Sequence, residues 1–114
     1  MPQYVPTSHT YSSAVKAGDT VFIGLHRGGG EDFETQFRKT FAALERTLAK
    51  LDCALAQVVK VNVYLKRIED LPEMEKLFAD YFPAGSFPAR MTSTTEFIDG
   101  DCLMMIDGVA YCGD

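Results

Sequence analysis

The clearest pattern in the chain is a stripe of apolar side chains with helical spacing. Positions three or four residues apart carry Phe33, Phe37, Phe41, Leu44, Leu48 and Leu51. Side chains at this spacing lie along one side of an α-helix. Three acidic residues, Glu31, Asp32 and Glu34, stand at the start, where the helix dipole favours negative charge. The pattern predicts a helix over residues 33–51 that packs on a core, so its aromatic side chains are packing residues and not a ligand site.

A second helix is predicted after the sequence Asp70-Leu71-Pro72-Glu73. A capping acid, an early proline and an acid three residues after the cap are typical of a helix N-terminus. The predicted buried stripe of this helix consists of Met74, Leu77, Phe78 and Tyr81, and Pro83 and Gly85 end it.

Three strands are predicted in the first two thirds of the chain. Residues 11–16 and 20–25 flank the turn signal Ala17-Gly18-Asp19. Residues 58–65 alternate, with Val59, Val61 and Val63 on one side and Lys60 and Asn62 on the other. The first ten residues contain Pro2 and Pro6 and are expected to be irregular. The glycines 28–30 are expected to form a flexible connector, because the lysine and hydroxyl residue of a phosphate-binding loop are missing.

Two further strands are predicted from Arg90 onward, joined by a hairpin turn at Asp99-Gly100. The last strand, residues 102–111, is apolar on both faces and therefore needs cover on both sides of its sheet. Two helices cover only one face of a sheet of this size. The sequence predicts an α+β fold in the order β-β-α-β-α-β-β, with one sheet, both helices on one side, and a second subunit on the other side.

Length and composition fit one domain that spans residues 1–114. The formal net charge is −5 and the 11 Lys and Arg residues are scattered, so a nucleic-acid-binding surface is not expected. No apolar run approaches the roughly 20 residues that span a bilayer, so no membrane association is expected. The N-terminus lacks the basic head and apolar core of a secretory signal, which favours a cytoplasmic location.

The chain has three cysteines, Cys53, Cys102 and Cys112, without C-x-x-C spacing. A structural zinc site usually needs four ligands at paired spacings, so no metal site is expected. The odd number of cysteines and their spacing favour free thiols in a reducing compartment.

Arg90 is the residue most suggestive of a binding site. It follows Phe87-Pro88-Ala89 and opens the polar run Met91-Thr92-Ser93-Thr94-Thr95. A guanidinium carries a planar fork of donors that suits a carboxylate or a phosphate. An arginine at this kind of position is also often a surface ion-pair partner, and the residue alone does not separate the two roles.

The chain resembles the RidA (YjgF) family of small enamine/imine deaminases. The resemblance rests on Val58-Val59-Lys60-Val61-Asn62-Val63-Tyr64-Leu65, on Phe78-Ala79-Asp80-Tyr81-Phe82 and on Phe87-Pro88-Ala89-Arg90, and it spans roughly Tyr11 to Ala110. It implies a chorismate-mutase-like fold and a homotrimer with clefts between subunits. It also implies that Arg90 grips the carboxylate of a 2-iminoacid or 2-aminoacrylate, which water converts to a 2-ketoacid and ammonia. No metal or organic cofactor is required for this chemistry.

Other residues of the family site map unevenly onto this sequence. Tyr11 matches an aromatic residue that reaches a neighbouring subunit's pocket, although a tyrosine packed at a strand start remains an equal alternative. Thr92 falls where many members carry a cysteine beside the ligand. Leu25 and His26 fall on a usual glycine and glutamine at the expected cleft edge. His26 is expected either to donate to the substrate or to be a satisfied side chain without a role in binding.

The last strand departs from the family pattern. Met105 stands where active members commonly carry a glutamate proposed to place the attacking water, and a thioether cannot take a proton. Asp107 lies two residues on, on the same face, where it either substitutes in part or forms a structural hydrogen-bonded pair. Glu75 stands where a helix asparagine is frequent. Two functions are therefore considered: a deaminase with Arg90 as carboxylate anchor, and a trimeric small-carboxylate-binding or regulatory module without chemistry. A ribonuclease activity is disfavoured by the acidic balance.

Overall fold

The protein forms one six-stranded sheet with two helices, as described for residues 1–113 in a computed structural model. The strands run in the order β1-β2-β3-β6-β4-β5 across the sheet. Their bounds are β1 (Gln3–Pro6), β2 (Ser12–Ala17), β3 (Thr20–His26), β4 (Val58–Leu65), β5 (Ala89–Thr94) and β6 (Met104–Tyr111). The helices are α1 (Phe33–Ala49) and α2 (Leu71–Phe78), and two short 3-10 turns precede β4 (η1, Leu55–Gln57) and α2 (η2, Ile68–Asp70).

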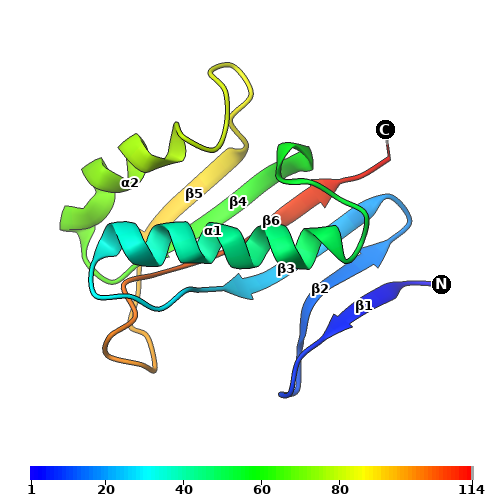
Figure 1. Cartoon of the computed structure of the whole chain (residues 1–114), viewed down its shortest axis with the longest axis horizontal. Coiled ribbons are helices and arrows are strands. Elements are labelled where there is room, and N and C mark those ends of the chain that lie inside the picture. The colour runs from blue at the N-terminus through cyan, green and yellow to red at the C-terminus, as the bar shows by residue number, and fades with distance from the viewer. Residues whose placement is uncertain (114) are drawn as a thin grey trace.

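Both helices lie on the same face of the sheet (Figure 1), which confirms the predicted α+β arrangement. The core lies between the helices and this face and consists of fully buried aromatic and aliphatic side chains, the largest being Phe37, Phe41, Phe78, Leu44, Leu48, Leu65, Met74, Met104 and Ile106. We call this side of the sheet the helix face, and the side without helices the open face.

Helix α1 forms as its apolar stripe predicts. The side chain of Asp32 caps its first turn, because the carboxylate accepts a hydrogen bond from the Thr35 backbone amide at 2.8 Å. The rings of Phe37 and Phe41 stack with centroids 4.7 Å apart, and Phe78 of α2 meets Phe41 edge-on at 5.6 Å. This aromatic cluster fixes α2 against α1 and so sets the position of every residue on α2.

Helix α2 is shorter than its stripe suggests. It ends at Phe78, so the half-buried Tyr81 lies in the turn that comes after it. The predicted capping role of Asp70 is wrong, because its side chain makes no hydrogen bond to the helix backbone. One of its oxygens instead lies 3.8 Å from Nε of Arg67.

The N-terminal residues form an edge strand, which corrects the expectation that residues 1–10 are irregular. β1 pairs antiparallel with β2, and Tyr4 lies opposite Val15. The register shifts between Val5 and Pro6, where the strand ends. Proline has no amide hydrogen to donate and is tolerated at the edge of a sheet or at an irregularity. The two prolines therefore limit the length of the strand without preventing it.

Strands β5 and β6 do not form the predicted hairpin. β4 lies between them: it pairs antiparallel with β6 and parallel with β5. The segment from Thr95 to Leu103 therefore crosses the end of β4 instead of making a tight turn, and the last strand begins at Met104, two residues later than expected.

A register shift between Val58 and Lys60 changes which side chains of β4 are buried. Val58, Val61 and Val63 lie in the core, whereas Val59 is 51% exposed, so its predicted place beside Val61 is wrong. Close packing between β4 and β6 continues at Gly108, where a Cβ atom would overlap the carbonyl oxygen of Lys60. Only glycine permits this approach of the two backbones.

The cysteines differ from expectation. Cys53, which lies after α1, and Cys112, which lies after β6, form a disulfide with their Cα atoms 5.8 Å apart. The interpretation of three free thiols is therefore wrong for this pair. Cys102 is a free, buried thiol, and burial raises its pKa. Two cysteines 59 residues apart in sequence become neighbours only through the tertiary fold.

The glycine connector is a packed segment. A Cβ atom on Gly28 would overlap Lys39 of α1, so this residue must be glycine for the connector to lie against the helix. The buried amide of Gln36 closes the same corner, because it donates to the carbonyl oxygens of Gly30 and Asp101 and accepts from the amide of Leu103. These contacts join the segment before α1 to the segment before β6.

The open face carries no helix (Figure 1), and an apolar row crosses β2, β3 and β6 beside the polar residues Lys60, Asn62 and Asp107. Cross-strand pairs place Phe22 between Val15 and Val109 in one row across β2, β3 and β6. Phe22 is 54% exposed, and Leu25 and Tyr111 are 51% exposed. An exposed apolar row of this kind is typical of a protein–protein interface.

Candidate functional site

Arg90 lies on the helix face, at the second position of the edge strand β5. It pairs in parallel register with Val61, a core residue of β4, which directs its side chain toward α2. The guanidinium carbon lies 5.1 Å from the ring centroid of Phe78. Nη2 donates to Oε2 of Glu75 at 2.5 Å. The side chain is 24% exposed, so it is held by an aromatic face and a carboxylate rather than extended into solvent.

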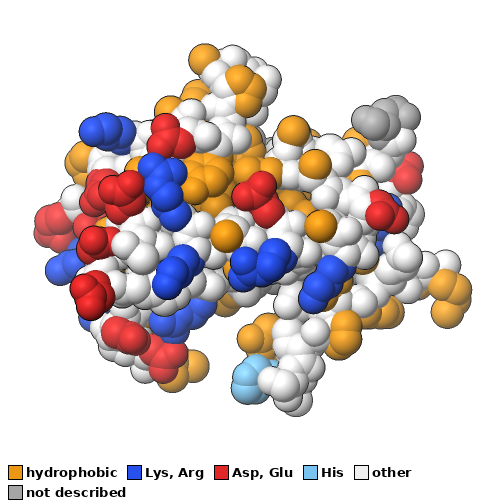
Figure 2. Space-filling model, in the orientation of Figure 1, with side chains coloured by type: hydrophobic (Ala, Val, Ile, Leu, Met, Phe, Trp, Pro, Cys, Tyr) orange, Lys and Arg blue, Asp and Glu red, His pale blue; other side chains and the backbone are white. Residues whose placement is uncertain are grey.

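A hollow of about 270 Å³ adjoins this guanidinium. It is lined by Glu75, Phe78, Phe87, Pro88 and Arg90, so one ion pair faces three apolar walls. The rest of the helix face carries charged side chains of both signs along α1 and α2 (Figure 2). The hollow combines a fork of donors with apolar contact area, which suits a small anion with a short carbon chain.

Thr92 lies on the same face as Arg90, two residues along β5. It pairs with the core residue Val63 and is half-buried. The structure therefore places the predicted pair Arg90 and Thr92 along one side of one strand.

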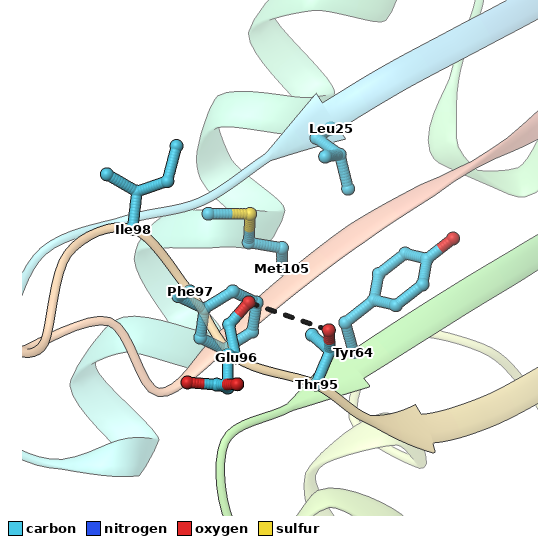
Figure 3. A pocket seen from close by; sticks show the side chains of 7 residues that line it. All are labelled: Leu25, Tyr64, Thr95, Glu96, Phe97, Ile98 and Met105. Carbon is cyan, nitrogen blue, oxygen red and sulfur yellow. Dashed lines mark hydrogen bonds between the residues drawn. The ribbon is translucent and has the colours of Figure 1, made fainter.

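Leu25 and Met105 lie on the open face instead (Figure 3). They line a hollow of about 380 Å³ together with Tyr64 and the segment Thr95–Ile98 after β5. Tyr64 pairs with Met105 across β4 and β6. The walls are mostly apolar, and the carboxylate of Glu96 adds a negative charge at the rim.

Tyr11 belongs to the same region of the open face. It lines a neighbouring hollow of about 410 Å³ with Leu25 and Met105. The side chain is 57% exposed, and its ring stacks on His9 with centroids 5.9 Å apart. It comes directly before β2 and is exposed, so it is not a tyrosine packed into the core at the start of the strand.

Asp107 is fully engaged by neighbours of the same chain. Oδ1 accepts a hydrogen bond from Nδ2 of Asn62 at 2.7 Å, and Oδ2 accepts from the Tyr64 hydroxyl at 3.0 Å. Desolvation, and after it the bond to Asp107, raises the pKa of Tyr64. Both oxygens of this half-buried carboxylate therefore have the hydrogen bonds that burial requires. These bonds link Asp107 to Asn62 and Tyr64 on the open face near Met105.

His26 lies away from both groups. The register shift between Ile23 and His26 reverses the alternation of β3, so Leu25 points to the open face and His26 points beneath α1. The ring is 7% exposed, with Nδ1 donating to the Gly24 carbonyl oxygen at 2.8 Å and Nε2 accepting from the Thr47 hydroxyl at 2.8 Å. This placement contradicts the expectation that His26 stands at the cleft edge.

Burial sets the protonation of this histidine. Desolvation lowers the pKa of His26 below its ordinary 6.5, against the smaller opposing effect of the hydrogen bond to Gly24. The neutral ring therefore forms both hydrogen bonds at neutral pH, and His26 acts as a buried packing residue.

Three residues at these hollows carry no binding signal of their own in the sequence. Glu75 and Tyr64 are in contact with Arg90 and Asp107, respectively. Arg27 lines the hollow beside Tyr11, and its Nη1 donates to Asp99 at 2.6 Å, which holds the loop before β6. Only Glu75 has a local signal: it lies one helical turn before Phe78, and both residues contact Arg90.

The predicted site residues thus divide between two faces of one sheet. Arg90 and Thr92 lie on the helix face, whereas Tyr11, Leu25 and Met105 lie on the open face. Within residues 1–113, His, Cys, Asp and Glu do not gather in a group of three that could hold a metal ion. No helix in that range is long and apolar enough to cross a membrane.

The fold and the site define a small α+β protein with one mixed sheet and a hollow lined by Arg90 at its edge strand. The sequence pattern of the Endoribonuclease L-PSP family, the YjgF/RidA family, matches residues 2–112, and the chain belongs to this family. The resemblance seen in the sequence is therefore confirmed.

Individual relatives agree with this assignment. A RutC family protein of Pyrococcus horikoshii is 33% identical over 109 residues, which cover 89% of this chain and 86% of that protein. A structure from Streptococcus pyogenes, described as a member of the yjgF family, superposes with a TM-score of 0.88 at 32% identity and covers 96% of this chain and 95% of that one. A 2-iminobutanoate/2-iminopropanoate deaminase of Dermatophagoides farinae is 27% identical over 90 residues, 72% of this chain and 70% of its own.

Proposed function

We propose that the protein hydrolyses 2-iminoacids of the 2-aminoacrylate type to 2-ketoacids and ammonia, with Arg90 holding the substrate carboxylate. The observation that carries the proposal is the position of Arg90, whose guanidinium rests on Phe78 beside a hollow with apolar walls. A bidentate contact with a carboxylate supplies both affinity and orientation. The relative named as a 2-iminobutanoate/2-iminopropanoate deaminase supports the same reaction class.

The reaction requires only that the protein position the substrate and a water molecule. The oxygen of a water molecule adds to the imine carbon, the carbon–nitrogen bond breaks, and the nitrogen leaves as ammonia while the carbon becomes a ketone. No electrons are exchanged with a cofactor. Holding the carboxylate and the water in one orientation provides much of the acceleration of such an addition.

A trimer in which two copies share each site is part of the proposal. Arg90 and Met105 face opposite sides of one sheet, so they can approach a common ligand only when the open face of one copy meets the edge of another. The exposed apolar side chains of Phe22 and Leu25 on the open face support such a contact.

A non-catalytic carboxylate-binding module is the second candidate, and Met105 is the observation that favours it. Its thioether cannot accept a proton, and Asp107, on the same face, has both oxygens engaged by Asn62 and Tyr64. Strand β6 therefore offers one carboxylate, and each of its oxygens already accepts a hydrogen bond within the chain.

The decisive assay generates 2-aminoacrylate with a serine dehydratase and monitors the loss of the imine. The wild type is expected to accelerate this loss, and Arg90→Ala is expected to abolish the acceleration. Arg38→Ala is the matched control, because Arg38 also lies over an aromatic ring, that of Tyr81, and pairs with acids, yet does not line the hollow. Equal rates with and without the wild-type protein, together with Arg90-dependent binding of a ketoacid, favour the binding module. Equal activity of wild type and Arg90→Ala rejects Arg90 as the anchor.

A further inference from the structure

Glu75 occupies part of the guanidinium that the proposed substrate needs. Its Oε2 accepts from Nη2 of Arg90 at 2.5 Å. Nη2 belongs to both two-pronged edges of a guanidinium, the one shared with Nε and the one shared with Nη1. Neither Nε nor Nη1 of Arg90 donates to any other residue among 1–113. A ligand carboxylate that binds Arg90 in two-pronged fashion therefore shares Nη2 with Glu75 and comes close to it.

The charges around the hollow determine which ligands it prefers. Of its five lining residues, only Arg90 and Glu75 are charged, and their charges cancel. A plain carboxylate that binds there leaves one positive charge facing two negative ones. A ligand with a cationic nitrogen next to its carboxylate restores the balance, because the nitrogen can donate to Glu75 while the carboxylate accepts from Arg90.

We propose that Glu75 makes the Arg90 hollow selective for zwitterionic ligands, those with a cationic nitrogen one carbon from the carboxylate, over plain carboxylates. The other walls, Phe78, Phe87 and Pro88, offer no side-chain acceptor that could take this part. Within the proposed function, on which this inference rests, a protonated 2-iminoacid is such a zwitterion and its 2-ketoacid product is a plain anion. Glu75 then retains the substrate and favours release of the product.

The expected effect is moderate, because the Glu75 side chain is 56% exposed and solvent screens its charge. A partly exposed pair of charges corresponds to roughly a 1.5- to 5-fold change in a binding constant. Glu75→Gln keeps the size of the side chain and its ability to accept a hydrogen bond while it removes the charge. Glu73→Gln is the matched control, since Glu73 is an exposed acid of the same helix that does not line the hollow.

The test measures the dissociation constants of two stable probes, 2-aminobutanoate and 2-oxobutanoate, by calorimetry. The wild type is expected to bind the amino acid more tightly than the ketoacid. Glu75→Gln is expected to shift the ratio of the two constants by about 1.5- to 5-fold toward the ketoacid, and Glu73→Gln is expected to leave it unchanged. Both constants are measured on the same protein, so a loss of folded protein affects them equally and leaves their ratio unchanged. A purely structural effect of Glu75→Gln therefore does not produce this shift.

Two results overturn the selectivity: an equal ratio in wild type and Glu75→Gln, or binding of neither probe by either protein. The 2-aminoacrylate assay, run in parallel, separates this inference from the proposed reaction. A shifted ratio in a protein without deaminase activity rejects the reaction and retains the selectivity. An unchanged ratio in an active deaminase rejects the selectivity alone.

Discussion

Arg90 and Met105 lie on opposite faces of the same sheet, separated by the single strand β4. Arg90 pairs with the core residue Val61 and faces α2, whereas Met105 pairs with Tyr64 and faces the side without helices. Side chains on opposite faces of one sheet do not converge on one small ligand. The proposed site therefore needs two copies of the chain, and this requirement underlies the predictions on assembly and on shared sites.

The open face is predicted to hold three copies together. Light scattering should give a mass of about three chains for the wild type. Phe22→Lys puts a charge into the apolar row between Val15 and Val109 and is expected to yield monomers, because burial of an unpaired ammonium is costly. Ile68→Lys is the control, since Ile68 is 55% exposed in the turn before α2. A monomeric wild type, or a Phe22→Lys protein with unchanged mass, contradicts the predicted interface.

The buried histidine predicts how stability depends on pH. The folded state lowers the pKa of His26 below 6.5, so the unfolded chain binds this proton more readily than the folded one. The contribution of His26 is complete above pH 6.5 and is lost as the pH falls from 6.5 toward the lowered pKa of the folded state. The wild-type Tm should therefore fall more steeply over this window than that of His26→Gln. His9→Gln, at an exposed histidine, should retain the wild-type slope, and equal slopes for wild type and His26→Gln reject the assignment.

The pair Cys53 and Cys112 predicts a stability that depends on reductant. The bond closes a loop between residues 59 positions apart, and such a cross-link typically stabilises a fold by about 2–4 kcal/mol. Denaturant unfolding with and without dithiothreitol should show this difference for the wild type and none for Cys53→Ser/Cys112→Ser. Cys102→Ser should lose stability in its buried site yet keep the response to reductant. A wild type indifferent to reductant, with three reactive thiols after unfolding, shows that the bond does not form.

Much of the fold could be predicted from the sequence because the patterns that determine it are local. The stripe from Phe33 to Leu48 identified α1, and the apolar last strand indicated a sheet with an uncovered face. Strand pairing was not readable in the same way. Alternation assigns side chains to faces within one strand, but it does not say that β4 lies between β5 and β6. The edge strand β1 was missed because prolines disfavour the interior of a sheet, whereas an edge tolerates them.

Arg90, Tyr11, Leu25 and Met105 all line hollows, and their roles in binding stay predictions. His26 was misplaced because one irregular position in β3 reverses which side chains face the helices, and no local signal marks it. The contact between Glu75 and Arg90 joins a helix to a strand 15 residues away, so it emerges only once α2 is packed on the sheet.

The central claim is that each site combines Arg90 of one copy with the open face of another, and mixed assemblies test it most directly. Arg90→Ala removes the anchor, and Leu25→Trp fills the hollow beside Met105 without placing a charge in the contact between copies. Each variant alone should form trimers without deaminase activity. After the two are unfolded, mixed in equal amounts and refolded, about one site in four should combine an intact Arg90 with an intact open face. Activity near a quarter of the wild type is the predicted result, and a mixture as inactive as its parents contradicts a site shared between copies.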